Sequence, residues 1–385
     1  MSLTHEVVRD IDRLTPLAPV WTGLAGRSGQ PLSTWAWTKA WWEHLRPVRA
    51  EPRVVVVRDG DRVVTIAPWF VDDPGARRVD YRFMGSGFLG VVGPFATPEA
   101  VWDAAGEVAA AFASVTPRPG LITFEGVDLR SPWPTLLRER WTGALRPTAF
   151  RPRVHSAPSV TLGHPDLDAW LATRSPGFRS HLRRMRRLLA KAGGRIRPAT
   201  PQTLHADLEA MFALHAGRWA GRGRSAFSGN RDAVVRMLAQ VGRTELATHG
   251  MQLWVVELDG APIAVQLFAS ADRTAVLWNG GWDERHARLS PGMLAILAGI
   301  ESAIERGVHR LDLGAGAQPY KLRFADGSVP NAWGHLVVPG RRVVGTSMTL
   351  TGPAARSVAT RFARRSLPGD RLDQLRRMRA RLGIG

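Results

Sequence analysis

Apolar and polar positions alternate in the same way in two separate stretches of the chain. The first stretch covers residues 53–70 and turns at Asp59-Gly60, and the second covers residues 252–270 and turns at Asp259-Gly260. Asp-Gly between two alternating apolar runs is the strongest short-range signal of a β-hairpin. The pattern therefore predicts one hairpin in each half of the chain.

The elements expected after each hairpin also follow one order: a strand, a helix and a closing strand. They are expected at 89–92, 98–114 and 121–125 in the first half, and at 275–280, 291–306 and 308–313 in the second. The two series lie roughly 200 residues apart, which is typical of a duplicated domain. Strands joined by a helical crossover indicate a mixed sheet of the α/β class. We predict a first domain over 1–155, a second over 156–340 and a tail over 341–385.

Helices are expected before each hairpin as well. Residues 33–45 carry four tryptophans, which we interpret as packing residues of the core and of the boundary between the halves. In the second half, Ser175-Pro176 is a typical helix start and Gly193-Gly194 a typical stop. The apolar side of this helix consists of Phe178, Leu182, Met185 and either Leu188 or Leu189, and its other side carries arginines. A further helix is expected over 203–220.

The composition narrows the class of protein. With 385 residues the chain is long enough for two domains. It contains no run of about 18 apolar residues that would indicate a transmembrane helix, and residues 1–20 are too acidic for a secretory signal, so we expect a cytoplasmic protein. The absence of cysteine excludes disulfides and thiolate chemistry. The eleven histidines show no spacing typical of metal ligands, so we expect no metal.

The formal net charge of +19 comes almost entirely from arginine, because Lys39, Lys191 and Lys321 are the only lysines. The charge is concentrated in two places. One is the helix expected at 179–191. The other is the tail over 341–385, which contains eleven arginines and two aspartates. Local clusters of this kind indicate a surface for a polyanion.

The end of the strand expected at 308–313 carries the most informative group of residues. Asp312 stands at the strand end, glycines follow, and Tyr320 and Lys321 come next. A strand that leads into flexible backbone and titratable groups is typical of a site at the edge of a sheet. Since Lys is a compact charge and Arg a planar fork, a lone Lys321 among arginines indicates a role that Arg does not fill. The alternative, a solvated loop lysine, stays open at this point.

A second candidate site lies between the strand at 275–280 and the following helix. Gly280 and Trp282 stand near the end of the strand, and Ser290-Pro291-Gly292 opens the helix, with Ser290 expected as its cap. The N–H groups and the dipole of such a helix start favour a phosphate. Many helices start this way and bind nothing. However, the order strand, loop, helix, strand brings this turn beside Asp312 and Lys321.

The order of elements and these two motifs resemble the GNAT acyltransferase fold. The segments Leu289–Gly292 and Asp312–Lys321 are similar to those of the CelD/BcsL-like acetyltransferase family of bacteria. That family is related to the Fem peptidyltransferases, which carry two GNAT-like domains. The arginine helix at 179–191 and the segment 212–219 fit the same pattern. The first half has no counterpart of Tyr320-Lys321, so we predict tandem GNAT-like domains with the site in the second.

The resemblance implies an N-acyltransferase that uses acyl-CoA, such as acetyl-CoA, and an amine acceptor. It places the CoA at Leu289, Ser290, Gly292, Met293 and Gly280. Acyl transfer needs a base, an acid for the leaving thiolate and a group that stabilises negative charge. The candidates for these roles are Asp312, Tyr320 and Lys321. His215 is either a base on the acceptor side or a core histidine. The candidates for substrate contacts are Arg218, Trp219, Trp282 and Arg323.

Two other functions stay open. A Fem-like enzyme would take its acyl group from aminoacyl-tRNA, and the clusters at 179–187 and in the tail would hold the tRNA backbone. A non-catalytic GNAT-like protein would use its basic tail on nucleic acid or anionic lipid. From residue 368 onward the tail has the pattern of an amphipathic helix, which suits a membrane surface, a partner or docking on the protein itself. The acceptor amine, the acyl chain length and the oligomeric state stay undetermined at this stage.

Overall fold

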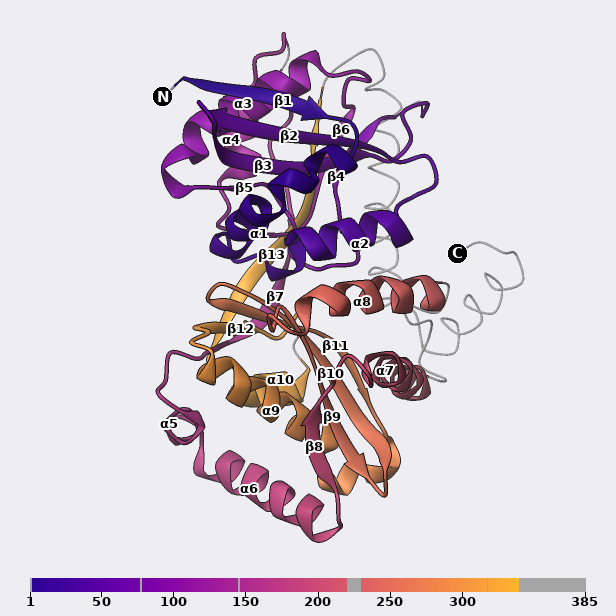
Figure 1. Cartoon of the computed structure of the whole chain (residues 1–385). Helices are drawn as coiled ribbons and strands as arrows, with labels where there is room; N and C mark the ends of the chain where they lie inside the picture. The colour runs from indigo at the N-terminus through magenta and orange to yellow at the C-terminus, as the bar shows by residue number, and fades with distance from the viewer. Residues whose placement is uncertain (1, 77, 145, 220–229, 317, 339–385) are drawn as a thin grey trace, which may run out of the picture.

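The computed structural model describes residues 2–76, 78–144, 146–219, 230–316 and 318–338, and each half of the chain forms one lobe of the protein (Figure 1). The strands of the first half are β1 (Leu3–Val8), β2 (Glu51–Asp59), β3 (Arg62–Val71), β4 (Asp80–Phe83), β5 (Phe95–Ala96) and β6 (Leu121–Asp128). Its helices are α1 (Ala18–Arg27), α2 (Trp35–Leu45), α3 (Val101–Ser114) and α4 (Trp133–Glu139), with short 3-10 helices η1 (Asp12–Leu17), η2 (Pro31–Ser33) and η3 (Pro98–Ala100).

The second half begins at the strand that follows α4. Its strands are β7 (Arg153–Thr161), β8 (Arg195–Pro198), β9 (Met251–Leu258), β10 (Ala261–Ala271), β11 (Thr274–Trp282), β12 (Arg310–Asp312) and β13 (Gly327–Val337). Its helices are α5 (Leu167–Ala172), α6 (Pro176–Lys191), α7 (Leu204–Trp219), α8 (Arg231–Glu245), α9 (Pro291–Glu305) and α10 (Pro319–Phe324), with the 3-10 helix η4 (Glu284–Leu289). No helix in the described ranges combines the length and the apolar character that crossing a bilayer would require. The tail predicted over 341–385 lies outside the described residues.

One sheet runs through both lobes. Its strand order is β1-β2-β3-β4-β6-β13-β7-β12-β11-β10-β9-β8, with β5 attached to β3. The pairs β4–β6 and β11–β12 are parallel and the other pairs are antiparallel. The predicted mixed sheet of the α/β class is therefore confirmed.

Both predicted hairpins are present. Strand β2 pairs with β3, and β9 pairs with β10, in antiparallel register. At the second turn Asp259 and Gly260 both adopt left-handed backbone angles, with φ of 51° and 75°. A type I′ turn requires positive φ at both central residues, which Asp and Gly tolerate better than branched residues do. The sequence signal at 259–260 thus has a direct physical cause.

The expected strand at 89–92 was wrong. The strand that pairs with both β3 and β6 is β4, and residues 89–92 lie in the loop that follows it. Leu89 is fully buried there, and its N–H donates to the carbonyl of Gly85, 2.8 Å away. An added Cβ on Gly85 would lie 2.7 Å from the Leu89 side chain. The apolar run is therefore a buried turn that covers the sheet.

The second half supplies both strands at the centre of the sheet, β13 and β7. Strand β13, the last described strand, pairs with β6 of the first half as well as with β7. Strand β7, which follows the first half in sequence, pairs with β12 of the second half. Strand β13 of the second half therefore extends the sheet of the first half, and β7 connects it to the remaining strands of the second half (Figure 1). The domain limits at 155 and 340 stay a prediction, and the first of them falls within β7.

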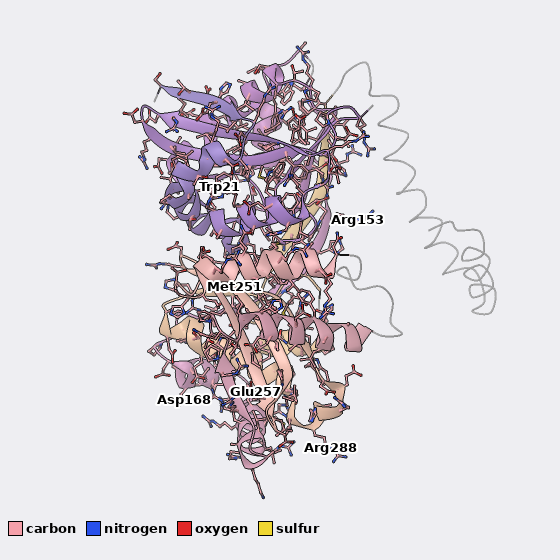
Figure 2. The ribbon with its side chains drawn as sticks, turned by 45° about the vertical axis from the view of Figure 1, so that its right-hand side comes forward. Trp21, Arg153, Asp168, Met251, Glu257 and Arg288 are labelled. Atoms are coloured by element: carbon pink, nitrogen blue, oxygen red, sulfur yellow. The ribbon has the colours of Figure 1, made fainter. Side chains whose placement is uncertain are left out.

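Large aromatic side chains form much of the interior. Trp21, Trp37 and Trp69 of the first half and Trp170 of the second are fully buried, and Figure 2 shows Trp21 within the first lobe. Trp37 belongs to α2, which packs against α8 of the other half. Its ring centre lies 6.5 Å from that of Trp278 in β11. The interpretation of the α2 tryptophans as core and boundary residues is confirmed.

Helix α6 forms at the predicted place. Its buried residues are Phe178, Leu182, Met185 and Leu189, whereas Leu188 is 39% exposed, so Leu189 is the fourth member of the apolar side. The helix is capped by Ser175, whose hydroxyl accepts a hydrogen bond from the N–H of Phe178. Its arginines cover the opposite side, where Arg183, Arg184 and Arg187 are exposed.

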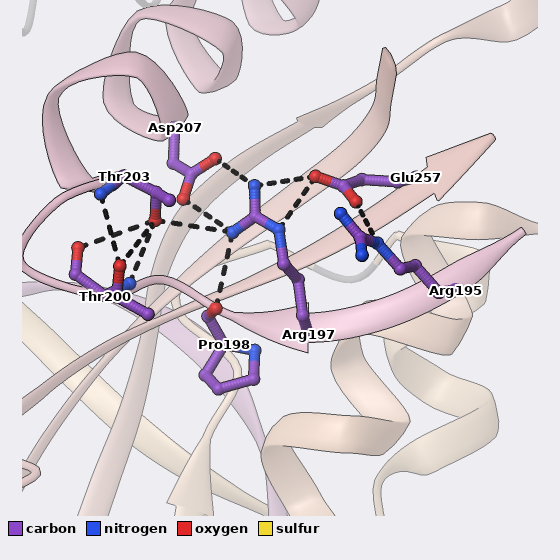
Figure 3. Close-up of polar contacts among 7 residues, drawn as sticks. All are labelled: Arg195, Arg197, Pro198, Thr200, Thr203, Asp207 and Glu257. Atoms are coloured by element: carbon purple, nitrogen blue, oxygen red, sulfur yellow. Dashed lines mark hydrogen bonds and ion pairs between the residues drawn. The ribbon is translucent and has the colours of Figure 1, made fainter. Parts of the chain in front are cut away.

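A buried ion network joins β8, β9 and α7 (Figure 3). The guanidinium of Arg197 donates two hydrogen bonds of 2.8 Å to Asp207 and one of 2.7 Å to Glu257. Asp207 is 2% exposed and Glu257 is 5% exposed. These hydrogen bonds, led by the one to Asp207, raise the pKa of Arg197 above its usual value. Since α7 lies on the sheet beside β11, the network also fixes one wall of the site described below.

We predict that Asp207→Ala lowers the free energy of unfolding by about 3 kcal/mol, because it leaves the Arg197 charge half-buried with one partner fewer. Urea unfolding measures the difference. The matched control is Asp168→Ala, which removes an exposed partner of Arg183 (Figure 2) and is expected to cost less than about 1 kcal/mol. Equal losses in the two variants would show that the network does not stabilise the fold.

Candidate functional site

Strands β11 and β12 separate after a short stretch of pairing. They are hydrogen-bonded only from Thr274 to Val276 on β11 and from Arg310 to Asp312 on β12. Beyond this point β12 ends, while β11 continues to Trp282 and stays paired with β10 on its other side. The edge of β11 from Leu277 onward is therefore left without β12. A cavity of about 410 Å³, here called the splay cavity, opens at this edge.

The splay cavity brings together most of the residues predicted from the sequence. Those that line it are His215, Gly280, Trp282, Ser290, Gly292, Met293, Tyr320 and Lys321. Its other lining residues are Gln266, Leu277, Trp278, Asn279, Ala287, Ile296, Leu313 and Gln318. Sequence reasoning missed Gln266 and Gln318, because a single polar residue inside an apolar strand or before a short helix carries no motif. Two motifs separated by about 30 residues thus meet in one place.

Among the predicted residues whose side chains the structure describes, Asp312, Leu289 and Arg323 do not line the splay cavity. Asp312 and Leu289 lie just outside it, and Arg323 lies with its guanidinium over the ring of Phe178, 4.9 Å from the ring centre. Arg218 and Trp219 end helix α7, and their side chains lie outside the described part of the structure. Their roles in substrate binding stay predictions.

The sequence led us to expect Tyr320 and Lys321 on a loop. They lie instead in the first turn of α10. Pro319 starts this helix, which is the position that its fixed φ favours. The preceding loop contains Gly314 and Gly316, with φ of 73° and 100°. These left-handed angles allow the chain to reverse direction between β12 and α10. The reversal turns both side chains toward the splay cavity.

Lys321 is buried rather than solvated. Its side chain is 7% exposed, and its ammonium donates to the carbonyl oxygens of Gly314 at 3.2 Å and Ala315 at 3.1 Å. Burial lowers the pKa of Lys321 to about 8, while the charge of Asp312 acts in the opposite direction. The alternative of a solvated loop lysine is therefore wrong. An amine with this pKa is present in both protonation states near neutral pH.

Asp312 holds the other side of the same loop. Its carboxylate accepts a 2.8 Å hydrogen bond from the N–H of Gly314, and the residue is 6% exposed. Burial raises the pKa of Asp312, and that hydrogen bond together with the charges of Arg310 and Lys321 lowers it in part. The N–H of Gly314 thus binds Asp312 and its carbonyl binds Lys321. The backbone of Gly314 therefore separates the two charged side chains.

The start of α9 differs from the start of α6 although both read Ser-Pro-Gly. Ser290 has a left-handed φ of 48° and makes no side-chain cap, so its expected capping role was wrong. Its hydroxyl lies 3.3 Å from Nε2 of His181 in α6. Gly292 lies against Trp282, since an added Cβ would be 3.1 Å from that ring. The start of α9 is therefore left without a capping side chain where it meets the cavity.

Basic side chains lie near this uncapped helix start. Burial lowers the pKa of His181, and the nearby charges of Arg323 and Arg184 lower it further. Both arginines therefore lie close to the residue that contacts Ser290. Their positive field adds to that of the α9 dipole and favours an anion at this end of the cavity. His181 was missed in the sequence because it stands alone among the arginines of α6.

His215 lies at the opposite wall. Its Nδ1 is 3.1 Å from the carbonyl oxygen of Gly280, and the ring is half-buried. Helix α7 reaches β11 at Gly281, where an added Cβ would be 2.5 Å from the backbone nitrogen of His215. Gly281 is thus required for the close approach of α7, whereas an added Cβ on Gly280 would meet Gln266 of β10. The hydrogen bond to Gly280 holds the imidazole at the cavity rather than in the core.

Comparisons with known proteins support this assignment of the fold. Residues 176–322, from α6 to α10, match the family model described as an acetyltransferase (GNAT) domain, and this part of the chain is a GNAT domain. The matched stretch contains all residues that line the splay cavity. The predicted GNAT relationship is therefore confirmed, whereas the finer likeness to CelD/BcsL-like enzymes stays a prediction. The sequence matches no curated protein.

Three solved structures have the same overall fold. The match to FemX covers 88% of this chain and 98% of the FemX chain, with a TM-score of 0.56 and 12% identity. A conserved protein of unknown function from Bacteroides thetaiotaomicron has a TM-score of 0.54 at 12% identity, with coverage of 87% of this chain and 99% of its own. The C-terminal domain of a putative lysylphosphatidylglycerol synthetase from Agrobacterium fabrum has a TM-score of 0.52 at 12% identity, with coverage of 88% and 96%. At 12% identity these matches show a shared fold and nothing about function. The predicted relation to Fem-type tandem folds is therefore confirmed for the fold.

The buried ammonium of Lys321 predicts a pH dependence of stability. Below pH 8 both the folded and the unfolded chain hold this proton, and the folded state bears the full cost of burial. Between about pH 8 and 10.5 the folded state releases the proton and the unfolded state keeps it, so the free energy of unfolding rises with pH.

We expect a rise of about 1–3 kcal/mol for the wild type relative to Lys321→Met across this window. Urea unfolding at several pH values measures it. Lys191→Met at the exposed end of α6 serves as the control for loss of one charge. A constant difference between wild type and Lys321→Met would contradict the lowered pKa.

Proposed function

We propose that the protein is an N-acyltransferase that transfers an acyl group from acyl-CoA to an amine. The observation that carries this proposal is the splay cavity itself. It has an uncapped helix start at Ser290 to Gly292, an open strand edge on β11, and Tyr320 with Lys321 at the far side. These are the features that an activated acyl donor with phosphates at one end requires.

The donor fits the cavity as follows. The pyrophosphate of CoA binds the N–H groups at the start of α9, where the dipole and the charges near His181 favour an anion. The pantetheine arm carries amide groups, and the open edge of β11 from Leu277 to Trp282 offers backbone donors and acceptors for them. The thioester then points toward Tyr320 and Lys321. No metal is needed for this arrangement.

The chemistry follows from the groups at that end. The amine nitrogen forms a bond to the thioester carbonyl carbon, the carbon–sulfur bond breaks, and the sulfur leaves as a thiol. The acceptor ammonium gives up two protons in total, one to the leaving sulfur and one to a base. Tyr320 is the candidate acid for the sulfur, and Lys321 has one N–H beyond its two carbonyl contacts to stabilise the carbonyl oxygen. Asp312 is the candidate base on the acceptor side of the loop.

A second donor, aminoacyl-tRNA, is favoured by one specific observation. The exposed face of α6 carries Arg183, Arg184 and Arg187, of which Arg184 lies near His181 at the start of α9, and the chain shares its fold with FemX. A tRNA donor would make catalysis fall steeply with salt because each phosphate contact releases counterions. A CoA donor would leave catalysis nearly independent of salt. Turnover measured from 50 to 200 mM salt separates the two donors.

The start of α9 provides a matched test of donor binding. Gly292→Glu places a carboxylate at the second position of α9, where the pyrophosphate is expected, and CoA binding should fall below detection in calorimetry. Gly177→Glu makes the same change at the second position of α6, where nothing lies within 4 Å. It should leave CoA binding unchanged. Undiminished CoA binding by a folded Gly292→Glu variant would remove the donor assignment.

Tyr320→Phe tests the leaving-group step. The hydroxyl matters only as the thiolate forms, so turnover should fall about 100-fold while CoA affinity stays within a factor of about two. The chain has one other tyrosine, Tyr81, whose hydroxyl donates to the carbonyl of Pro117 in the first half. Tyr81→Phe should lower the melting temperature and leave turnover of the folded enzyme intact. Full turnover by Tyr320→Phe would exclude Tyr320 as the acid.

A further inference from the structure

A second cavity of about 340 Å³ lies between the two halves, here called the junction cavity. Its walls come from β11, β12 and β13, from the end of β6, and from the loops at 28–32, 90–94 and 130–133. Gly314 and Ala315 of the glycine loop line it, whereas Leu313 and Lys321 line the splay cavity. The two cavities therefore lie on opposite sides of one loop.

Polar residues cover the sheet where it forms the junction cavity. Asn331 on β13 lies directly opposite Asp128 on β6. Arg310 and Asp312 are two residues apart on β12, so they point to the same face. A covered sheet face normally carries apolar side chains that pack against its cover. The row of amide, carboxylate and guanidinium groups is not explained by packing.

Two of these polar groups are buried without a hydrogen-bond partner among the described residues. They are the amide oxygen of Asn331, which is 5% exposed, and Nε of Arg310. An unpaired buried polar atom destabilises the folded state, and native proteins keep few of them. The pair consists of one acceptor and one donor, and both residues line the junction cavity. A bound molecule with its own donor and acceptor would satisfy both.

The charges in the junction cavity balance. Arg130 forms an ion pair of 2.6 Å with Asp128, and Arg310 and Asp312 form a second pair of opposite charges on β12. The charge of Arg310 influences both carboxylates, so the four groups share one electrostatic environment. With no net charge in the cavity, a neutral or zwitterionic molecule is favoured over an anion or a cation. Trp133, Trp333, Val276 and Val329 add apolar walls that suit a small organic body.

We propose that the junction cavity binds the acyl acceptor and that this acceptor is an amino acid. Its ammonium binds the carboxylate of Asp312 beside the glycine loop, and its carboxylate binds the guanidinium of Arg310. Its side chain lies along the apolar walls and donates a hydrogen bond to the amide oxygen of Asn331. The role of the amino acid as acceptor rests on the proposed acyl transfer. Its binding to the junction cavity does not require an acyl donor.

The position of the ammonium explains the glycine loop. An added Cβ on Gly314 would lie 3.7 Å from Nζ of Lys321 and 3.5 Å from the carbonyl oxygen of Leu277. Gly314 therefore lies in the wall between the two cavities, close to Lys321. For the transfer, the thioester carbonyl has to pass Gly314 through the gap that opens where β12 ends, so that it meets the nitrogen bound at Asp312 directly. After it loses a proton it attacks the carbonyl carbon, and the acyl group ends on the amino acid as an amide.

Calorimetric titration of the full chain tests the site directly. The probes are the twenty protein amino acids and, for each one that binds, its amino alcohol and the matching acid without the amine, such as glutaminol and 4-carbamoylbutanoate for glutamine. We expect at least one amino acid with a side-chain donor to bind, and its amino alcohol and matching acid to bind at least 10-fold more weakly. If no amino acid binds the wild-type protein, the inference is overturned without reference to any variant.

Asn331→Leu separates a ligand site from a structural one. If the unpaired oxygen is kept for a ligand, this variant should raise the melting temperature and weaken the preferred amino acid at least 10-fold. Ser328→Ala is the control, because it lies exposed on the same strand and lines neither cavity. Unchanged binding with a lowered melting temperature would mean that Asn331 is structural, and the inference would fail.

Arg310→Met tests the carboxylate contact. Amino acid binding should weaken at least 10-fold while binding of the amino alcohol stays the same, and an equal loss for both would contradict the assignment. CoA titration of the same proteins keeps the two proposals apart. CoA binding without any amino acid binding would overturn only the acceptor inference. Amino acid binding without CoA binding would overturn the acyl-CoA function and leave the junction cavity as a binding site.

Discussion

The antiparallel pairing of β7 with β13 is the constraint on which both cavities depend. It joins two sheets into one, and it sets the position of β12, whose three residues are held by β7 on one side. Strand β11 is held along its length by β10 instead. Because β12 is paired with β7 and β11 is paired with β10, the two strands diverge once β12 ends. The same pairing brings the loops of the first half over the exposed face of β12 and closes the junction cavity.

The choice of Lys at position 321 becomes clear from its surroundings. Its ammonium is enclosed by two backbone carbonyls and is 7% exposed. A guanidinium is larger, remains charged at all relevant pH values and presents its donors in a plane. A buried amine can release its proton when desolvation lowers its pKa to about 8. The rarity of lysine in this chain was therefore informative, although the reason is burial and not exposure at a loop.

Local signals predicted the elements whose structure depends on nearby residues. The turn at Asp259-Gly260 and the α6 apolar side with its Ser175 cap follow from short-range rules, and both are found as predicted. The pairing of β13 with β6 could not be predicted, because it joins residues about 200 positions apart and β13 alternates too weakly to be recognised. The Ser-Pro-Gly starts of α6 and α9 show the same limit. Ser175 caps its helix, while Ser290 is turned into a left-handed angle beside His181.

The candidate site could be predicted in part for the same reason. Tyr320, Lys321 and the start of α9 carry motifs, so their meeting in one cavity was foreseeable from the order of elements. The junction cavity was not, because Asn331, Arg310 and Asp128 come from strands whose neighbours are decided by the positions of β7 and β13 at the centre of the sheet. None of them belongs to a local pattern. Their grouping is visible only when the polar atoms of each cavity wall are matched with partners.

The two peptide groups that flank the Cα of Gly314 connect the two cavities electrostatically. The N–H of Gly314 is bound by Asp312 on the junction side, and its carbonyl is bound by Lys321 on the splay side. The carboxylate of Asp312 raises the pKa of Lys321 toward its usual value, against the larger effect of burial. An ammonium that binds Asp312 offsets that carboxylate, so the pKa of Lys321 falls further. Binding of the proposed amino acid in the junction cavity would therefore shift the protonation of Lys321 in the splay cavity through this loop.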